Sequence, residues 1–305
     1  MTSPVPHDQQ VDCLHGLPAP AKLNLFLHVT GRRPDGYHLL QSVFMLVDWC
    51  DHIDLDLRHD GVIQRIDSQP GHLPSDDLCV KAARALQAAT GCPLGATIRL
   101  DKRLPAEAGM GGGSSDAATC LIGLNRLWGL GLRRSELASI GLRLGADVPF
   151  FIGGHTAWVE GVGEQLTPVR LPAATFVVVK PQTGASTPLI FASADLRRDT
   201  KTAILQGFAA NDAERSGSPI LLDLNRVLSE GHNDLEPVAQ ALCPEMGACI
   251  RWLRSLGLQG RMTGSGTAVF AQMRPAVRLP EPPGPWLVQQ CSNMDTHPLL
   301  DWCSD

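Results

Sequence analysis

The sequence lacks several patterns that would assign it to a class at once. No apolar run approaches the roughly 18 residues needed to cross a bilayer, and no Lys/Arg-rich block appears among the 305 residues. The formal net charge of −5 gives no general basic field for nucleic acid, so any anion must be held by locally placed groups. The sequence therefore predicts no nucleic-acid, membrane or protein partner.

Targeting and metal signatures are missing as well. The amino terminus, MTSPVPHDQQVDCLHGL, has neither the basic start and apolar core of an export signal nor the Arg- and Ser-rich pattern of a transit peptide. Nine cysteines occur without CxxC spacing, and an odd number argues against a complete disulfide framework. The ten histidines show no HExxH motif or paired metal spacing. We expect a cytoplasmic protein with reduced thiols and no structural zinc.

The chain does have the apolar content and the mixed periodicity of a folded α+β protein. With 44% hydrophobic residues it can fill one large domain or two. In PAKLNLFLHVTG the leucines alternate with Lys22, Asn24 and two further residues, which predicts a strand with a core face and a functional face. Further patterns predict a helix at 78–89 ended by Gly91, helices at 233–241 and 244–256, strands at 96–100 and 173–181, and an extended segment at 260–273. No βαβ repeat is present, so α+β is favoured over a doubly wound fold.

Two local features add to this outline. Ser135 can cap a helix running toward Gly145. A polar stretch containing proline, 163–172, predicts a domain boundary near residue 168, with domains 1–168 and 169–305.

The most distinctive stretch is LPAEAGMGGGSSDAAT, residues 104–119. Glycines let the backbone take positive φ and let another molecule approach its N–H groups closely. Because the stretch lies between a strand and a helical stripe, these N–H groups open a helix whose positive dipole end suits phosphate. The alternative is that Ser114 or Ser115 simply caps an ordinary helix, although a cap requires one serine and not four glycines.

Two common phosphate motifs do not fit this loop. A P-loop requires a lysine directly after its last glycine, and no lysine occurs between Lys102 and Lys180. A dinucleotide fold requires GxGxxG with an acidic residue about 20 positions later, which is also missing. A different phosphate-binding loop is therefore predicted.

PAEAGMGGGSSDAA resembles the phosphate-binding motif of the GHMP kinases, and two further stretches agree with this resemblance. PAKLNLFLHVTGRRPDGYH is similar to the amino-terminal motif of that superfamily, and RMTGSGTAVFA to its carboxy-terminal glycine loop. The resemblance spans about residues 18–272, and it implies a two-domain fold with the active site between the domains. The first would be an ATP-binding α/β domain like domain 2 of ribosomal protein S5, and the second a ferredoxin-like α+β domain.

Within the superfamily, DGYH and GADVPFFIGGHTAWVEGVGE resemble the branch whose acceptor is a methylerythritol unit joined to a cytidine diphosphate. This resemblance implies transfer of the γ-phosphoryl group of ATP to the 2-hydroxyl of that unit, in the non-mevalonate route to isoprenoid precursors. By the same resemblance, Asp147 is the general base and Lys22 is the catalytic lysine that assists it. The alternatives are an Asx turn or helix cap for Asp147 and a solvated strand-edge position for Lys22.

The resemblance also assigns the binding residues. Tyr37 and Phe191 would stack on the cytosine and His38 would hydrogen-bond it, while core positions are the alternative for the two aromatic residues. The remaining acceptor-binding residues are Asn24, Thr187, Gly264 and Ser265, the glycine loop being otherwise a tight turn. The predicted nucleotide-binding residues are Lys102, Pro105, Gly109, Met110, Gly111, Gly112, Gly113, Ser114 and Ser115.

ATP chemistry implies Mg²⁺, for which Ser115 is the predicted ligand. Met110 replaces the usual leucine of the motif, a change that nearly conserves volume. Two rival functions stay open at this point, another small-alcohol GHMP kinase and a nucleotide-binding regulator without catalysis. The presence of both Lys22 and Asp147 argues against the regulator.

Overall fold

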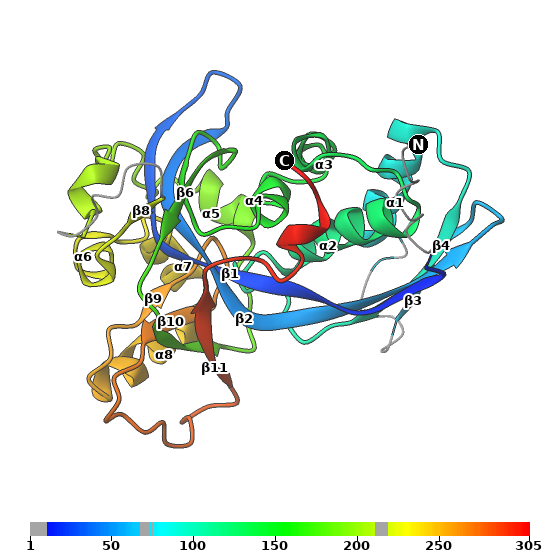
Figure 1. The fold of residues 1–305 in the computed structure, drawn as a ribbon. Helices are drawn as coiled ribbons and strands as arrows, with labels where there is room; N and C mark the ends of the chain where they lie inside the picture. Colours follow the sequence, from blue (N-terminus) through cyan, green and yellow to red (C-terminus); the bar gives the residue numbers. More distant parts are fainter. Residues whose placement is uncertain (1–10, 68–73, 75, 211–218) are drawn as a thin grey trace.

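A computed structural model describes residues 11–67, 74, 76–210 and 219–305 of the chain. It contains a long hairpin at the amino terminus, followed by helices and strands in small groups (Figure 1). The strands are β1 (Cys13–Arg32), β2 (His38–Arg58), β3 (Ile63–Asp67), β4 (Gly95–Asp101), β5 (Ala157–Glu160), β6 (Gln165–Arg170), β7 (Thr175–Lys180), β8 (Ile220–Leu221), β9 (Arg261–Met262), β10 (Val269–Gln272) and β11 (Leu287–Met294). The helices are α1 (Leu78–Thr90), α2 (Gly112–Leu127), α3 (Arg134–Leu142), α4 (Val148–Gly153), α5 (Thr187–Ala192), α6 (Leu224–Glu230), α7 (Glu236–Leu242) and α8 (Pro244–Ser255), with 3-10 turns at Leu205–Phe208 and Leu300–Trp302.

Strand β2 organises the sheet. Strand β1 pairs with it antiparallel along one edge, and β5, β11 and β4 pair with successive parts of its other edge. Strand β11 continues onto β7, which joins the amino-terminal and carboxy-terminal parts of the molecule in one sheet. Only the β3–β4 and β6–β8 pairs are parallel in the described residues. This mixed topology confirms the α+β prediction.

Helices α1 to α4 cover one face of the β1–β2–β4 region (Figure 1). Helix α2 lies at the centre of this layer, and its buried side chains pack on the sheet and on α1 and α4. A left-handed Gly91 ends α1 as the sequence predicted, because only glycine takes that conformation easily. The hydrophobic core between these helices and the sheet therefore fixes the start of α2 against β1.

The carboxy-terminal half has its own cores. Helix α6 and the turn at Leu205–Phe208 pack on the opposite face of β1, and α7 and α8 pack on β7 and β10. After β11 the chain returns to the first half, where the Arg134 guanidinium donates to the carbonyl oxygens of Leu300 and Cys303.

Three local expectations are corrected. The first strand is longer than predicted, and the face that carries Lys22 and Asn24 is buried as well, because Phe26 on that face packs against Trp158 and Phe208. Ser135 lies inside α3 rather than at its cap, since the helix begins at Arg134 and the backbone N–H of Arg133 donates to Glu136. Residues 261–272 form two short strands around a glycine turn, not one extended segment.

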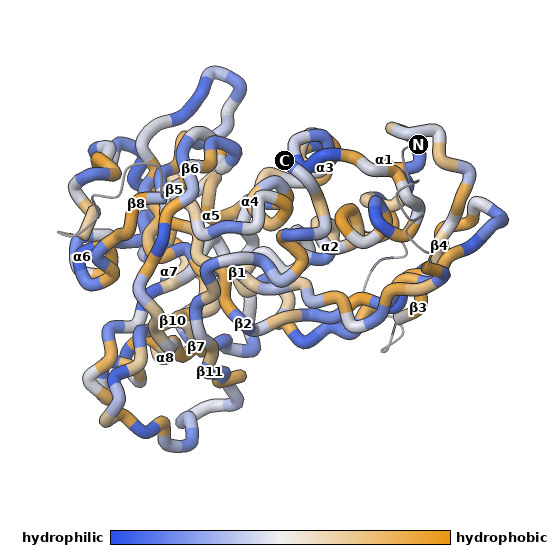
Figure 2. The backbone as a smooth tube through the Cα atoms, in the orientation of Figure 1, coloured by the Kyte–Doolittle hydropathy of each residue, from blue (hydrophilic) through white to orange (hydrophobic). Residues whose placement is uncertain are grey.

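Short hydrophobic stretches alternate with hydrophilic ones along the trace (Figure 2). None of the helices in the described part of the chain has the length and apolar character needed to span a bilayer.

Candidate active site

The outer edge of β1 is the foundation of the site. Unpaired strand N–H groups need acceptors, and here they find them in loops that are distant in the chain. The backbone N–H of Lys22 donates to the Met110 carbonyl at 3.0 Å, and that of Asn24 donates to Thr263 Oγ1 at 2.8 Å. Both glycine loops are thus attached to the same edge of β1, the first at Lys22 and the second at Asn24.

Lys22 and Asp147 form an ion pair at this edge. The distance from Lys22 Nζ to Asp147 Oδ2 is 3.5 Å, and the lysine side chain is 4% exposed while the aspartate is 31% exposed. Burial lowers the pKa of Lys22, and the Asp147 carboxylate opposes that shift. The ammonium also lies 4.4 Å from the centre of the Phe44 ring.

Asp147 immediately precedes α4, so the position is that of a helix cap. Its side chain makes no capping hydrogen bond to α4 within the described structure. Pro149 in the first turn and the buried residues 148–152 anchor the helix instead. The carboxylate is therefore available to Lys22 and to a ligand.

Asn24 connects the lysine to the sheet. Lys22 Nζ donates to Asn24 Oδ1, and Asn24 Nδ2 donates to Ser42 Oγ on β2 at 3.1 Å. Ser42 Oγ in turn donates to the Phe26 carbonyl. This buried chain fixes the direction of the ammonium group.

The glycine-rich loop enters α2 as expected. Gly111 has φ +71° and precedes the helix, and a Cβ there would lie 2.9 Å from the Phe151 ring and 3.2 Å from Lys22 Cγ. The first helical hydrogen bond to this residue comes from Ser115 N. The N–H groups of Gly112, Gly113 and Ser114 have no acceptor within the described parts of the chain, so they are free to bind an anion.

The second glycine loop packs directly on the first. A Cβ on Gly266 would lie 2.1 Å from Gly109 N, and one on Gly264 would lie 2.4 Å from Gly109 O. Asn233 holds this second loop in place through hydrogen bonds from Nδ2 to the Met262 and Gly264 carbonyls. Only glycine allows the two loops to approach so closely.

A cavity of about 470 Å³ opens beside the first loop. Its volume is within the range of small-molecule sites. Predicted nucleotide-binding residues that line it are Lys102, Pro105, Gly109, Met110, Gly111, Gly112, Gly113 and Ser114.

Lys102 is held at this cavity by two carboxylates. Its ammonium pairs with Asp51 and, at 2.7 Å, with Asp116 Oδ2. Burial acts to lower the pKa of Lys102, but Asp116 and Asp51 outweigh it and the pKa is raised. Burial raises the pKa of Asp116 to about 7, with Lys102 opposing and Asp51 adding to the shift. Lys102 is thus a fixed cation at the cavity wall.

Ser114 and Ser115 lie in different environments. Ser114 lines the cavity, whereas Ser115 is fully buried and does not line it. Ser115 Oγ has no hydrogen-bond partner among the described residues. An orphaned buried oxygen of this kind is the ligand type that Mg²⁺ takes.

Four of the seven predicted acceptor residues line a second cavity, of about 590 Å³. Tyr37, His38, Thr187 and Phe191 all line it. The His38 and Phe191 rings lie 5.0 Å apart at 32°, and Tyr37 is 65% exposed at the rim. Tyr37 is therefore not a core residue, whereas Phe191 is half-buried and packs against the core around α7 and α8 while it lines the cavity.

Hydrogen bonds connect the second cavity to the ion pair. Thr187 Oγ1 and Ser265 Oγ lie 2.8 Å apart, and Ser265 follows Gly264 in the loop whose Thr263 binds Asn24. The structure therefore brings the predicted acceptor, catalytic and nucleotide residues into one continuous region.

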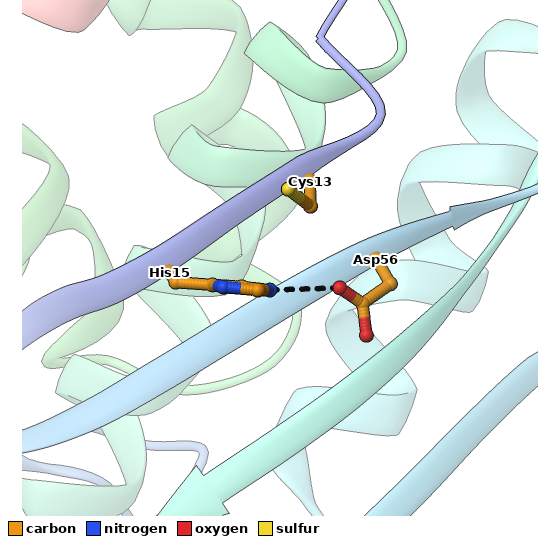
Figure 3. A group of neighbouring side chains, drawn as sticks. All are labelled: Cys13, His15 and Asp56. Carbon is orange, nitrogen blue, oxygen red and sulfur yellow. Dashed lines mark hydrogen bonds and ion pairs between the residues drawn. The ribbon is translucent and has the colours of Figure 1, made fainter.

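A trio of side chains close enough together to ligate a metal lies outside this region (Figure 3). Cys13 and His15 project from β1 toward Asp56 of β2, and His15 Nε2 is 2.8 Å from Asp56 Oδ1. Asp56 also pairs with Arg99. The trio stands seven or more positions along β1 from Lys22, or more than about 20 Å at strand spacing. Its sulfur and nitrogen ligands do not suit Mg²⁺, so it is not a metal site for ATP.

Comparisons with known proteins agree with this geometry. The GHMP kinases N terminal domain model matches residues 77–155, and the GHMP kinases C terminal model matches 207–276. A 4-diphosphocytidyl-2-C-methyl-D-erythritol kinase of Polaromonas naphthalenivorans (strain CJ2) is 57% identical over 308 residues, covering 99% of this chain and 100% of the relative. The chain belongs to the GHMP kinases, and within them to the 4-diphosphocytidyl-2-C-methyl-D-erythritol kinases.

Solved structures place this GHMP kinase in the same fold. A crystal structure of 4-(cytidine 5'-diphospho)-2C-methyl-D-erythritol kinase has a TM-score of 0.68 at 32% identity, covering 90% of this chain and 98% of the other. A homoserine kinase from Cytophaga hutchinsonii has a TM-score of 0.69 at 16% identity, covering 96% and 98%, and it shows the fold alone. Kinases of this family use ATP as phosphoryl donor. The domain boundary near residue 168 stays a prediction.

Sequence reasoning missed several residues that this GHMP kinase uses to build the site. The buried Asp51 pairs with Lys102, and Thr263 Oγ1 accepts a hydrogen bond from the backbone N–H of Asn24. Asn233 holds the second loop, and Arg198 donates a hydrogen bond to His38. Asp116 carried a signal, since it directly follows the two serines of the motif. The others pair across long chain separations and have no local signature.

Proposed function

We propose that this protein transfers the γ-phosphoryl group of ATP to the 2-hydroxyl of 4-diphosphocytidyl-2-C-methyl-D-erythritol, giving the 2-phosphate and ADP. The observation that carries this proposal is the Lys22–Asp147 pair at 3.5 Å, attached to the glycine loop through the Met110 carbonyl. The relatives' shared name, at 57% identity over nearly the whole chain, supports the choice of acceptor.

In this mechanism the triphosphate lies against the free N–H groups of Gly112, Gly113 and Ser114. The acceptor hydroxyl lies between Lys22 and Asp147. Asp147 accepts the hydroxyl proton while the new oxygen–phosphorus bond forms and ADP leaves. Lys22 stabilises negative charge on the transferring group and, through its ion pair, holds the Asp147 carboxylate beside the hydroxyl.

The cytidine of the acceptor occupies the 590 Å³ cavity. Tyr37 and Phe191 provide aromatic faces for the base, and His38 provides a polar edge. Thr187, Gly264 and Ser265 lie between this cavity and the ion pair, so they border the rest of the acceptor.

The orphaned Ser115 Oγ fits an oxygen-binding cation, and we propose it as a ligand of Mg²⁺. When bound, Mg²⁺ neutralises charge on the phosphate oxygens. The cytoplasmic location stays a prediction.

Purified protein tests the function directly. With ATP and Mg²⁺ we expect ADP to form only when the cytidylated acceptor is present, and the product to carry one new phosphate ester. Turnover of mevalonate or homoserine in its place would contradict the acceptor assignment. Calorimetric binding of ATP without transfer to any acceptor would instead favour the inactive regulator.

A further inference from the structure

Arg198 is a half-buried residue that contacts His38 and Phe191 of the acceptor cavity. Its Nε donates a hydrogen bond to His38 Nε2 at 3.1 Å. Its Nη groups donate to three carbonyl oxygens, those of Leu196 at 2.9 Å, Phe191 at 3.0 Å and Ser193 at 2.7 Å. One guanidinium thus joins the start of β2 to the end of α5.

This contact determines which nitrogen of His38 carries the proton. An arginine Nε always bears hydrogen and never accepts, so His38 Nε2 must be the acceptor. The ring is therefore neutral with its proton on Nδ1. Burial, Arg198 and Arg32 together lower the pKa of His38, which agrees with a neutral ring. Nδ1 has no hydrogen-bond partner among the described residues, so it remains available to a ligand.

Cytosine and uracil differ at N3, the ring position to which an N–H donor such as His38 Nδ1–H can bond. Cytosine has a bare N3 that accepts a hydrogen bond, whereas N3 of uracil carries hydrogen. A fixed N–H group facing N3 bonds to cytosine and opposes uracil, because two donors that face each other leave both unpaired.

We propose that Arg198 is a positioning residue that sets base specificity, by holding His38 in the neutral Nδ1–H form that accepts cytosine and rejects uracil. This inference rests on the proposed function, in which a cytidine occupies the 590 Å³ cavity. The same guanidinium binds the Phe191 carbonyl, so it fixes the stacking wall and the polar edge relative to each other. Lysine has no planar fork and cannot span these four acceptors.

Binding of cytidine 5'-diphosphate and uridine 5'-diphosphate tests the proposal without requiring turnover. Calorimetry is run with a saturating non-hydrolysable ATP analogue, which keeps both probes out of the nucleotide site. Loss of one hydrogen bond with an opposed donor predicts that the wild type prefers the cytidine probe by roughly tenfold to hundredfold. In Arg198→Lys we expect this ratio to fall below about threefold.

The His38 tautomer gives a second readout that a merely structural role would not move. ¹⁵N NMR of the wild-type ring should show protonated Nδ1 and bare Nε2, and Arg198→Lys should show a mixture. Arg197→Lys is the matched control, because Arg197 is exposed and its side chain pairs only with Asp199 among the described residues. It should change neither the binding ratio nor the tautomer.

A double-variant cycle then tests whether Arg198 acts through His38. His38→Asn should abolish the base preference, since an amide presents either a donor or an acceptor, and adding Arg198→Lys should change the ratio no further. A further change in that background would overturn the proposal, as would equal wild-type binding of the two probes. A wild type that prefers the cytidine probe and shows the Nδ1–H ring but phosphorylates no acceptor would overturn the proposed function and leave this inference standing.

Discussion

Replacing Gly266 by alanine tests the contact between the two glycine loops. Gly266 does not have a left-handed φ, so its backbone conformation accepts any residue. Space alone forbids a side chain, because the added methyl group would lie 2.1 Å from Gly109 N and 2.2 Å from Ala108 C. These are backbone atoms and cannot swing away.

The size of the effect follows from these distances. Ordinary van der Waals contact begins at 3.4 Å, so the loops must separate by more than 1 Å to admit the methyl group. Misplacement of this size costs about 10²-fold in rate where phosphates must be held in line. Overpacking of this kind also lowers the free energy of unfolding by about 1–3 kcal/mol. We expect kcat/KM for ATP to fall by about two orders of magnitude in Gly266→Ala.

Gly207→Ala is the matched control. Gly207 also lacks a left-handed φ, and a Cβ there would meet no atom within 4 Å. Initial-rate kinetics and urea unfolding of both variants separate the loss of geometry from the loss of stability. If Gly266→Ala kept kcat/KM within threefold of the wild type and the same stability, the close contact between the two glycine loops would not be required.

Three other substitutions test separate parts of the site. Asp147→Asn keeps the shape but removes the proton acceptor, so kcat should fall by about 10²–10⁴-fold while acceptor KM changes little, and a loss below threefold would move the base elsewhere. Tyr37→Ala removes a face that stacks on the cytosine and is worth about 1–3 kcal/mol, so acceptor KM should rise by about 5- to 150-fold with ATP KM unchanged. An unchanged acceptor KM would show that the cytosine binds away from Tyr37. Burial raises the pKa of Asp116 from 3.8 to about 7, so this group favours the folded state below pH 3.8 and loses that contribution as pH rises through about 7. Asp116→Asn should flatten this fall in urea-unfolding free energy, and an unchanged pH slope would contradict the shift.

The sequence predicted the parts of the site that depend on local pattern. A strand, a glycine run and a helical stripe follow one another between residues 96 and 127, so the loop at the start of α2 could be read directly. The position of Asp147 before α4 could also be read, but not whether its side chain caps the helix. That choice depends on Lys22, which lies on another element.

The remainder depends on contacts between distant segments. The alternation in β1 indicated two faces but could not show that Phe26 is buried on the second, since α6 and the turn at Leu205–Phe208 supply that cover. Arg198 and His38 are 160 positions apart, and no single segment reveals that they meet. The pairing of Lys102 with Asp51 likewise arises only when β2 and β4 align.

The position of the acceptor hydroxyl decides whether Asp147 can act as the base. A crystal structure of the wild type with a non-hydrolysable ATP analogue and the cytidylated acceptor measures this position. We expect the 2-hydroxyl oxygen at about 2.6–3.2 Å from an Asp147 carboxylate oxygen, with the phosphates on the amides of residues 112–114. A hydroxyl bound out of reach of both Asp147 and Lys22 would contradict the mechanism.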